Sequence, residues 1–453
     1  MRTLMIGISG IRGIIGESLT PELLIRFASA FGTYLSGGKV VVGRDTRISG
    51  AMIKHSVFAG LMSTGCEVVD VDVATTPSVS LMVKELGARG AVVITGSHNP
   101  VEWNALKFMG SDGEILPERR ARELLDIYYA GSFRNVSWNN LVPVVEDDSA
   151  GDVHINRVLR RIDVKKVRRR RIKVAIDSCN GAGSLVTPKL LKALGCEVVP
   201  IHCTPDGLFP HNPEPTFSNV RDLCRIVRRS GAEIGFAQDA DADRLAVVNE
   251  KGTYLSEEYT LALAAMYVLE HRKGDVAANL STSRMVDDIA ARHGVRVFRT
   301  KVGEANVAEE MKAKGCVIGG EGNGGVIDPE IHYTRDSLVA IALVLSLLAE
   351  RGETISRIAG RIPRYHMRKL KVEASRDAAA EVISLVGRRF PDARADRRDG
   401  LRLDWPDRWV HVRPSATEPA LRIIAEAPRE KDVEVLGEEV MRIAERVVRQ
   451  TDA

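Results

Sequence analysis

The sequence predicts an α/β protein of three homologous α/β/α domains with mixed, largely parallel sheets, followed by a smaller C-terminal α+β domain. Short apolar runs and helical stretches alternate in the same order three times over residues 38–325, which is the pattern of parallel βαβ units with helices on both faces of a sheet. Beyond residue 366, strands follow one another directly and helices flank them, which favours an α+β arrangement. A chain of 453 residues is also too long for a single core.

Each of the three units is predicted to contain strand, helix, strand, helix and strand. The first unit has these elements at 40–42, 49–64, 68–73, 79–86 and 91–94. The second has them at 174–176, 185–194, 197–201, 220–229 and 233–237. The third has them at 276–280, 284–293, 295–298, 305–314 and 316–318. A period of about sixty to a hundred residues is too long for a solenoid and indicates domains. We expect the boundaries 1–150, 151–253, 254–365 and 366–453.

The C-terminal domain is predicted to contain strands at 369–373, 400–404, 409–412 and 421–426 and helices at 378–389 and 433–448. Between the third unit and this domain, the apolar run at 338–349 is too short to span a bilayer and predicts a buried helix.

Composition and charge exclude several classes of protein. The 64 basic residues barely outnumber the 60 acidic ones, so the net charge of +4 does not suggest a nucleic-acid partner. The six cysteines form no C-x-x-C pair and are expected to be reduced core thiols. The N-terminus shows no charged-then-apolar leader. We therefore expect a cytoplasmic protein without membrane or nucleic-acid partners.

A candidate nucleophile follows the strand at 91–94. Residues 95–100 form a predicted turn at the carboxyl end of this strand, where open α/β sheets bind ligands. Gly96 permits a tight turn, and Pro100 keeps Asn99 out of helical space. The turn would hold up an exposed Ser97 hydroxyl beside the His98 imidazole. An ordinary β-turn, which Ser, Asn and Pro also favour, remains the alternative.

A candidate metal site follows the strand at 233–237. Asp239, Asp241 and Asp243 alternate with alanines, so in extended backbone the three carboxylates would project to one side. Such a cluster of like charges needs a cation, and hard oxygen ligands select Mg²⁺ or Ca²⁺. Arg244 follows directly and could hold a phosphate oxygen beside the metal ion. The alternative is a solvated acidic turn.

A candidate phosphate site lies in the C-terminal domain, where Arg413, Ser415, Thr417 and Arg422 surround a strand-to-loop transition. Two guanidinium groups, two hydroxyls and free backbone N–H groups suit a phosphate monoester. The alternative is a polar turn before an edge strand.

Two further segments are ambiguous by themselves. Glu321 and Asn323 lie among five glycines, which let the backbone approach a ligand closely, and a carboxylate with an amide can bind vicinal sugar hydroxyls. Arg12, in a Gly-flanked segment near the N-terminus, is either a surface arginine or a phosphate contact. Serine, metal, sugar and phosphate sites together indicate phosphoryl transfer through a phosphoserine.

Nearly the whole chain resembles the α-D-phosphohexomutase family. Residues 95–100, 239–244, 320–325 and 413–419 resemble, in order, its phosphoserine, metal, sugar and phosphate loops. The resemblance implies three related α/β domains and a fourth that closes over the substrate. It also implies interconversion of hexose 6-phosphate and hexose 1-phosphate through a 1,6-bisphosphate that reorients in the cleft.

The resemblance also implies roles for individual residues. Ser97 would carry the phosphate, one oxygen of which would complete a single Mg²⁺ site with Asp239, Asp241 and Asp243. His98, Lys107 and Arg244 would serve near the transferred proton and phosphoryl group, and Arg12 would contact the phosphate. The expected substrate contacts are Lys301, Glu321, Asn323, Arg413, Ser415, Thr417 and Arg422.

The sequence departs from the family in two places. Ala240 and Ala242 stand where glycine is commoner, and Gly325 stands where many members carry a histidine. The segment 301–304 resembles phosphoglucosamine mutases of the archaeal type, so glucosamine phosphate is the expected substrate.

Several alternatives stay open. Mannose or glucose phosphate is the alternative substrate, and a Mg²⁺-dependent sugar phosphatase or a silent phosphosugar-binding regulator is the alternative function. The resemblance leaves a homodimer open.

Overall fold

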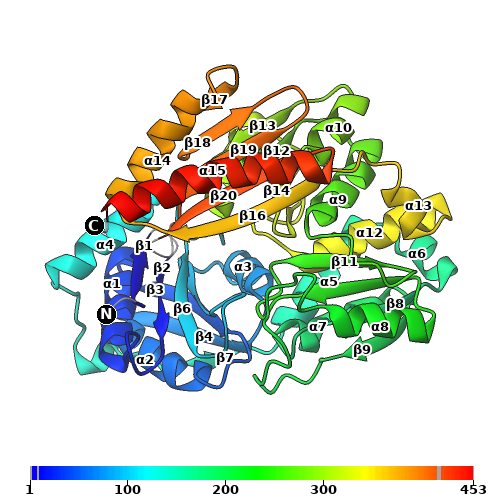
Figure 1. Cartoon of the computed structure of the whole chain (residues 1–453). Coiled ribbons are helices and arrows are strands. Elements are labelled where there is room, and N and C mark those ends of the chain that lie inside the picture. The colour runs from blue at the N-terminus through cyan, green and yellow to red at the C-terminus, as the bar shows by residue number, and fades with distance from the viewer. Residues whose placement is uncertain (1–2, 8–9, 416–419, 452–453) are drawn as a thin grey trace.

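Four β-sheets and the helices that cover them make up the computed structural model, which describes residues 3–7, 10–415 and 420–451 (Figure 1). In the view of Figure 1 the first sheet lies at the lower left, the second at the lower right and the third at the upper right. The C-terminal domain lies above the first and beside the third. No helix in the described part of the chain is long and apolar enough to cross a membrane.

The first sheet has seven strands in the order β1-β2-β6-β5-β3-β4-β7. Its strands are β1 (Met5–Gly7), β2 (Gly10–Ile14), β3 (Gly38–Arg44), β4 (Cys66–Val73), β5 (Gly90–Ile94), β6 (Trp103–Met109) and β7 (Val145–Glu146). The helices are α1 (Pro21–Leu35), α2 (Gly50–Ser63), α3 (Thr76–Glu85), α4 (Glu118–Ala130), the 3₁₀ turn η1 (Trp138–Asn140) and α5 (Ala150–Arg161). Val40 and Val42 of β3 pack toward α1 and α2, whereas Val41 packs toward α3. Both faces are therefore covered, which explains the continuous apolar run.

The second and third sheets repeat one topology. Their orders, β11-β10-β8-β9 and β15-β14-β12-β13, match the order β6-β5-β3-β4 within the first sheet. The strands are β8 (Lys173–Asp177), β9 (Glu197–Ile201), β10 (Ile234–Gln238), β11 (Leu245–Asn249), β12 (Val276–Asn279), β13 (Val297–Thr300), β14 (Ile318–Glu321) and β15 (Gly325–Ile327). In each unit three strands are parallel and the fourth returns antiparallel. The three α/β units predicted from the repeat are therefore present, with mixed sheets.

The antiparallel return strands β6, β11 and β15 are among the elements that the sequence analysis missed, as are the helices α1, α4, α5 and α9 (Glu258–His271). Each of these strands follows its partner after a short turn, and the three turns are the serine, metal and sugar loops. The predicted strand at 316–318 is also shifted, because β14 begins at Ile318 and includes Gly319, Gly320 and Glu321. These glycines pair with β12 on one side and β15 on the other, so they are strand residues rather than loop.

The second and third units share one core. Their helices are α6 (Val164–Arg170), α7 (Gly183–Ala193), α8 (Arg221–Ser230), α9 (Glu258–His271), α10 (Met285–Arg292), α11 (Glu304–Lys314), α12 (Ser337–Arg351) and α13 (Ile355–Ala359). A single cluster of buried apolar side chains runs from Ile155 to Ile362 and includes α9 and α12. The apolar run at 338–349 is therefore a buried helix, as predicted.

The C-terminal domain is a five-stranded antiparallel sheet in the order β16-β20-β19-β18-β17, with two helices against it. Its elements are β16 (His366–Glu373), α14 (Arg376–Arg389), β17 (Arg394–Asp396), β18 (Leu401–Asp404), β19 (Trp409–Pro414), β20 (Ala420–Ala427) and α15 (Glu430–Thr451). Apolar residues of α14, α15 and the strands form its own core. The predicted α+β class is confirmed.

Candidate active site

The serine loop turns the chain between β5 and β6 and directs Ser97 toward the second domain. The Ser97 Oγ donates to Oδ2 of Asp239 at 3.0 Å, and the Ser97 N–H donates to Oγ1 of Thr95 at 2.8 Å. The residue has a φ of 49°, a strained conformation for a side chain other than glycine. Only 2% of Ser97 is exposed. The expectation of an exposed hydroxyl is therefore wrong, because the hydroxyl faces the Asp239 carboxylate and not solvent.

Arg47 holds this loop in place, and sequence reasoning did not single it out. Its guanidinium donates to the carbonyl oxygens of Ser97 and Asn99 at 2.7 Å and of Trp103 at 3.0 Å. The Arg47 Nε pairs with Oδ2 of Asp45 at 3.0 Å, and the whole side chain is buried. A β-carbon on Gly96 would lie 2.7 Å from the guanidinium carbon, so the glycine makes room for Arg47 rather than supplying the positive φ.

The three aspartates of the metal loop do gather, although by a turn and not by the extended backbone that the sequence analysis assumed. The N–H of Ala242 donates to the carbonyl of Asp239 at 3.1 Å, and Ala242 has a φ of 55°. One carboxylate oxygen from each of Asp239, Asp241 and Asp243 lies within 4.8 Å of the others, and all three residues are buried. Burial beside two other carboxylates raises the pKa of Asp239 well above its ordinary value.

This set of ligands fits a hard divalent cation. Oδ1 of Asp241 and Oδ1 of Asp243 are buried oxygens without a hydrogen-bond partner in the described structure. Buried carboxylate oxygens without partners are costly, and an all-oxygen cluster of this kind is what Mg²⁺ binds.

Lys107 and Arg244 already compensate part of this charge, as does Arg335, which is described below. The Lys107 Nζ, on β6, donates to Oδ2 of Asp241 at 2.6 Å and lies 3.5 Å from Oδ2 of Asp243. The Arg244 Nε lies 4.0 Å from Asp239 and 3.7 Å from Asp243. The nearby carboxylates raise the pKa of Lys107 against the effect of its burial, so this amine carries a full positive charge.

Arg12 and His98 lie on the first-domain side of the site. Arg12 is on β2, and its Nη1 donates to Oδ1 of Asn99 at 2.6 Å. The His98 Nδ1 lies 3.4 Å from the Ser97 Oγ. Burial, together with the cations Arg244 and Arg12, holds the pKa of His98 well below its usual value. The imidazole is therefore neutral near pH 7.

The sugar loop holds Glu321 at the end of β14. Its Oε1 accepts from Asn279 Nδ2 at 2.7 Å and from the N–H of Gly303 at 2.8 Å. Its Oε2 accepts from Arg335 Nη1 at 2.7 Å and, at 3.4 Å, from the Asn323 Nδ2. Both predicted residues of this loop are thus adjacent, within a network that fixes the carboxylate.

Arg335, before α12, joins the sugar loop to the metal loop and was missed by sequence reasoning. Its Nη2 donates to Oδ2 of Asp243 at 2.6 Å while Nη1 binds Glu321, and its Nε lies 3.3 Å from Glu304. A β-carbon on Gly325 would collide with the aliphatic part of Arg335. The arginine therefore fills the space beside position 325, where many members of the resembled family carry a histidine.

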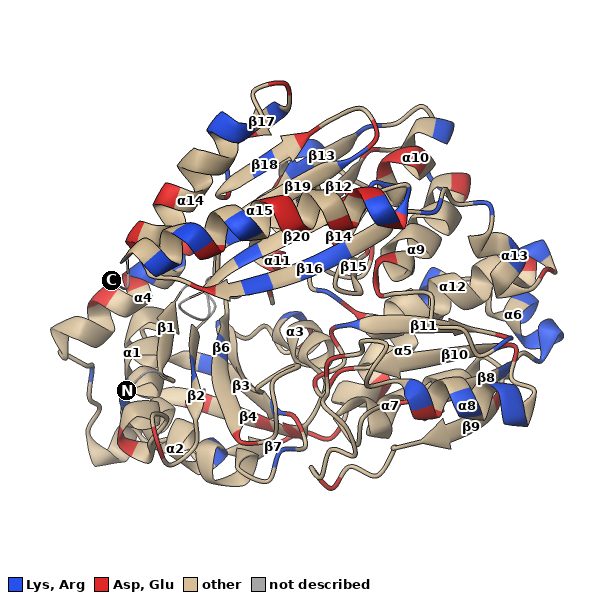
Figure 2. Cartoon of the chain, viewed as in Figure 1, with Lys and Arg blue, Asp and Glu red and all other residues tan. Residues whose placement is uncertain are grey.

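The phosphate loop presents a row of cations across three strands. Arg413 of β19 lies opposite Arg422 of β20, which in turn lies opposite Lys371 of β16. Directly paired residues project to one face of a sheet, so these like charges share a face that favours an anion. Figure 2 shows basic positions on β16 at this edge of the domain. The N–H of Ser415 donates to Ala420 O at 2.7 Å.

Two predicted substrate contacts remain, Lys301 and Thr417. Thr417 lies outside the described residues. Lys301 is exposed at the end of β13, directly before Val302. The N–H of Val302 and the Nε of Arg413 both donate to Oδ2 of Asp399, at 3.0 and 3.1 Å, so this carboxylate brings the segment after Lys301 to the phosphate loop.

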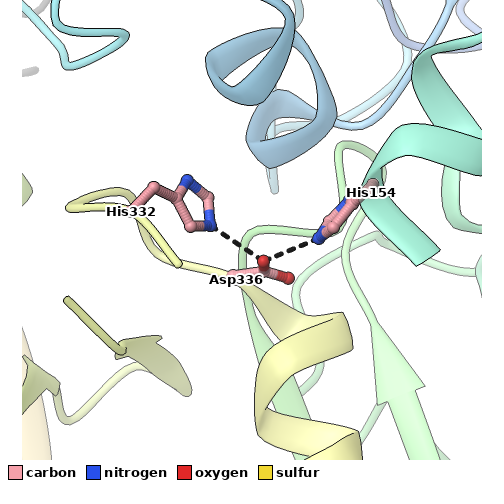
Figure 3. Close-up of side chains that lie close together, drawn as sticks. All are labelled: His154, His332 and Asp336. Carbon is pink, nitrogen blue, oxygen red and sulfur yellow. Dashed lines mark hydrogen bonds and ion pairs between the residues drawn. The ribbon is translucent and has the colours of Figure 1, made fainter. Parts of the chain in front are cut away.

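His154, His332 and Asp336 form a buried cluster next to the metal loop, and Figure 3 shows how the three side chains meet. The two imidazole Nε2 atoms lie 2.7 and 2.9 Å from the same oxygen of Asp336. The Nδ1 atoms meet the hydroxyls of Ser78 and Ser80, so the cluster ties the first domain to the start of α12. Next to it, the Ser337 Oγ donates to the carbonyl of Ala242 in the metal loop at 2.6 Å.

Comparison with known proteins gives matches along the whole chain. Family models described as phosphoglucomutase/phosphomannomutase α/β/α domains I, II and III match residues 3–135, 152–252 and 256–365. The model of the C-terminal domain of the same proteins matches residues 367–448.

Individual relatives and solved structures agree with these matches. A probable phosphoglucosamine mutase of Methanopyrus kandleri is 40% identical over 98% of both chains. A phosphoglucomutase/phosphomannomutase of Thermococcus kodakarensis is 39% identical over 94% of this chain and 95% of its own. The crystal structure of a Burkholderia thailandensis phosphoglucomutase/phosphomannomutase family protein has a TM-score of 0.85 at 27% identity, covering 97% of this chain and 96% of that one.

Proposed function

The chain belongs to the phosphoglucomutase/phosphomannomutase family and is a phosphohexomutase, and we propose that glucosamine phosphate is the hexose phosphate on which it acts. The choice of the amino sugar is supported by relatives in Methanopyrus and Thermococcus that match over nearly the full length and are named probable phosphoglucosamine mutases. Mannose or glucose phosphate remains the second candidate, because another Thermococcus relative carries that name.

The observation that carries the chemistry is the contact between the Ser97 Oγ and Asp239. A hydroxyl held 3.0 Å from a buried cluster of three aspartates is placed to carry a phosphoryl group beside a cation. We propose one Mg²⁺ per chain, held by Asp239, Asp241, Asp243 and an oxygen of phosphorylated Ser97. When bound, Mg²⁺ would supply neutralisation of negative charge at the phosphoryl group. A solved Aspergillus fumigatus N-acetylphosphoglucosamine mutase, similar to this chain in fold, was crystallised with GlcNAc-6P and magnesium.

The reaction then proceeds by two transfers at Ser97. The phosphoryl group passes from Ser97 to a free hydroxyl of the substrate, which forms a hexose 1,6-bisphosphate and returns the serine to its hydroxyl form. After the bisphosphate has reoriented, Ser97 takes the other phosphoryl group. In the first transfer the substrate hydroxyl loses a proton and the Ser97 oxygen gains one, and in the second the proton moves the other way. His98, whose Nδ1 lies 3.4 Å from the serine oxygen, would relay this proton. Lys107 and Arg244 balance charge at the transferred group.

Substrate binding would use the loops of the other domains. We propose that Glu321 and Asn323 bind sugar hydroxyls, and that Arg413 and Arg422 hold the distal phosphate with Ser415 and Thr417. Arg12 and Lys301 would contact the substrate from the first and third domains. The cross-strand pairing of Arg413 and Arg422 supports this assignment, because two like charges on one face are stabilised by an anion.

The test is ³¹P NMR of the purified protein with Mg²⁺ and a trace of hexose 1,6-bisphosphate. The 1-phosphates of glucosamine, glucose and mannose are offered in turn, and we expect the glucosamine compound to be converted to its 6-phosphate fastest. Ser97→Ala should abolish turnover while substrate still binds. If inorganic phosphate were the only product, the proposed function would be wrong and the protein would be a phosphatase. Fastest conversion of mannose or glucose phosphate would replace the substrate but keep the reaction.

A further inference from the structure

A second cluster of histidines and a carboxylate lies in the second domain and shares no residue with the cluster of three aspartates. Asp177 ends β8, His202 follows β9, and His211 lies in the long loop before α8. The His202 Nδ1 lies 3.0 Å from Oδ2 of Asp177, and the His211 Nε2 lies 3.1 Å from the same oxygen. Asp177 is buried, whereas the histidine side chains keep 23% and 14% of their surface exposed. The cluster is thus reachable from solvent.

The hydrogen bonds of His211 decide which of its nitrogens carries a proton. The Nδ1 lies 2.9 Å from the carbonyl oxygen of Asn212, so Nδ1 must be the donor in that contact. In the neutral imidazole the Nε2 then presents a lone pair to the Asp177 carboxylate at 3.1 Å. Two electron-rich atoms at this distance need a positive charge between them, either a second proton or a metal ion. A backbone carbonyl on the far nitrogen is the usual partner of a metal-binding histidine.

The spacing of the atoms suits a small tetrahedral cation. Ligands about 2.0 Å from a tetrahedral Zn²⁺ lie about 3.3 Å from one another, close to the 3.0 and 3.1 Å observed here. The second oxygen of Asp177 accepts from the N–H of Cys179 at 2.9 Å, which orients the carboxylate. Two imidazoles and a carboxylate, with a fourth position open to water, are a common ligand set for Zn²⁺ and its neighbours.

The cluster in Figure 3 is a useful contrast, because it has the same residue types but needs no metal. The Nδ1 atoms of His154 and His332 face serine hydroxyls, which can donate as well as accept. Both Nε2 atoms can therefore carry a proton and donate to Asp336. The other oxygen of Asp336 caps α12, so this buried cluster is satisfied as it stands.

We propose that Asp177, His202 and His211 form a second metal site, for a borderline divalent transition ion such as Zn²⁺, separate from the three-aspartate site. Its consequence is structural, because His211 belongs to the loop that leads to α8 and covers part of the active site. In that loop the ring of Phe209 lies 4.8 Å from the guanidinium of Arg47. Glu214 lies 3.8 Å from Arg244. A metal ion at the cluster fixes this loop to the end of β8.

The test uses the full-length protein, stripped of metal with a chelator and then saturated with Mg²⁺ so that the aspartate site is filled. Co²⁺ is titrated in while visible absorption is recorded, because tetrahedral Co²⁺ with nitrogen ligands absorbs far more strongly than octahedral Co²⁺ with oxygen ligands. We expect strong bands that saturate at one equivalent and that Zn²⁺ abolishes by displacement. His202→Asn and His211→Asn should each weaken binding at least tenfold, whereas His55→Asn, at an exposed histidine elsewhere, should not.

Each outcome decides the question. Wild-type protein without strong bands, or with bands that persist in both His202→Asn and His211→Asn, would overturn the proposal and leave a proton between His211 and Asp177. The measurement does not depend on catalysis, so it stands whether or not the substrate proposed above is correct.

Discussion

Replacement of Arg47 by lysine tests whether the position of the serine loop sets the rate. Arg47 donates to the carbonyls of Ser97, Asn99, Pro100 and Trp103 and pairs with Asp45. A lysine ammonium has three donors on one nitrogen, so at least two of these five contacts are lost. A hydrogen bond from a charged group contributes about 1.5–3 kcal/mol, so the loop loses about 3 kcal/mol or more of its preference for the native position.

If the loss falls on the reactive geometry, kcat/KM should drop by about two orders of magnitude, since about 1.4 kcal/mol corresponds to tenfold. The assay is steady-state turnover of glucosamine 1-phosphate, with intact mass spectrometry to measure phosphorylation of Ser97 by the bisphosphate. The matched control is Arg44→Lys in the same segment. The ion pair of Arg44, with the exposed Asp72 at 2.9 Å, is of a kind that contributes little, and its one further hydrogen bond in the described structure goes to the carbonyl of Asp45 at 3.3 Å, not to the serine loop. Arg47→Lys with a kcat/KM within threefold of wild type, or no slower than Arg44→Lys, would refute the reasoning.

Three further predictions concern the metal, the sugar loop and His411 of β19, whose Nδ1 lies 2.9 Å from the Ser281 Oγ of the third domain. Chelation of Mg²⁺ should lower the thermal midpoint of unfolding, and added Mg²⁺ should raise it with the logarithm of its concentration. The reason is that the buried aspartate oxygens bind the ion only in the folded state. A midpoint that does not change with Mg²⁺ concentration would contradict the metal site. Arg335→Gln leaves Asp243 and Glu321 without their shared cation. It should raise the free energy of the transition state by about 3 kcal/mol, which lowers kcat/KM roughly a hundredfold. The control, Arg161→Gln, breaks a remote ion pair and should lower stability alone. Burial lowers the pKa of His411 from 6.5 to about 4, so the unfolded chain binds the proton at a higher pH than the folded chain does. The free energy of unfolding should therefore fall by up to about 3 kcal/mol as pH drops from 6.5 to 4. The denaturant midpoint of His411→Gln should depend less on pH over that window than the wild-type midpoint, and an equal pH dependence of the two would exclude this origin.

Much of the fold could be predicted because its pattern is local. Val40, Val41 and Val42 are buried on both sides, and a strand covered on both faces reads as a continuous apolar run. The return strands β6, β11 and β15 were missed for a related reason. β15 has only three residues and β6 mixes polar with apolar residues, so neither has a clear strand pattern. β11 does have an apolar run, but it follows directly on the polar metal loop and was missed there.

The aspartate site shows where a correct prediction had a wrong reason. Alternation of Asp239, Asp241 and Asp243 predicted a shared direction in extended backbone, whereas the carboxylates converge through a turn with Ala242 at positive φ. Asp and Ala in alternation are compatible with both backbones, and the choice depends on what surrounds the loop. The N–H groups of Asp243 and Arg244 both donate to the Asp239 carboxylate and hold the turn.

The sequence by itself determined the repeated α/β units, the α+β domain and the candidate site residues, because periodicity and residue chemistry are properties of short segments. Only the tertiary structure decided which cations and carboxylates meet. Arg47 reaches Ser97 across 50 residues, and Arg335 reaches Asp243 across 92. Contacts at such separation depend on how whole sheets and helices pack, and a side chain buried by that packing carries no local mark of its partner.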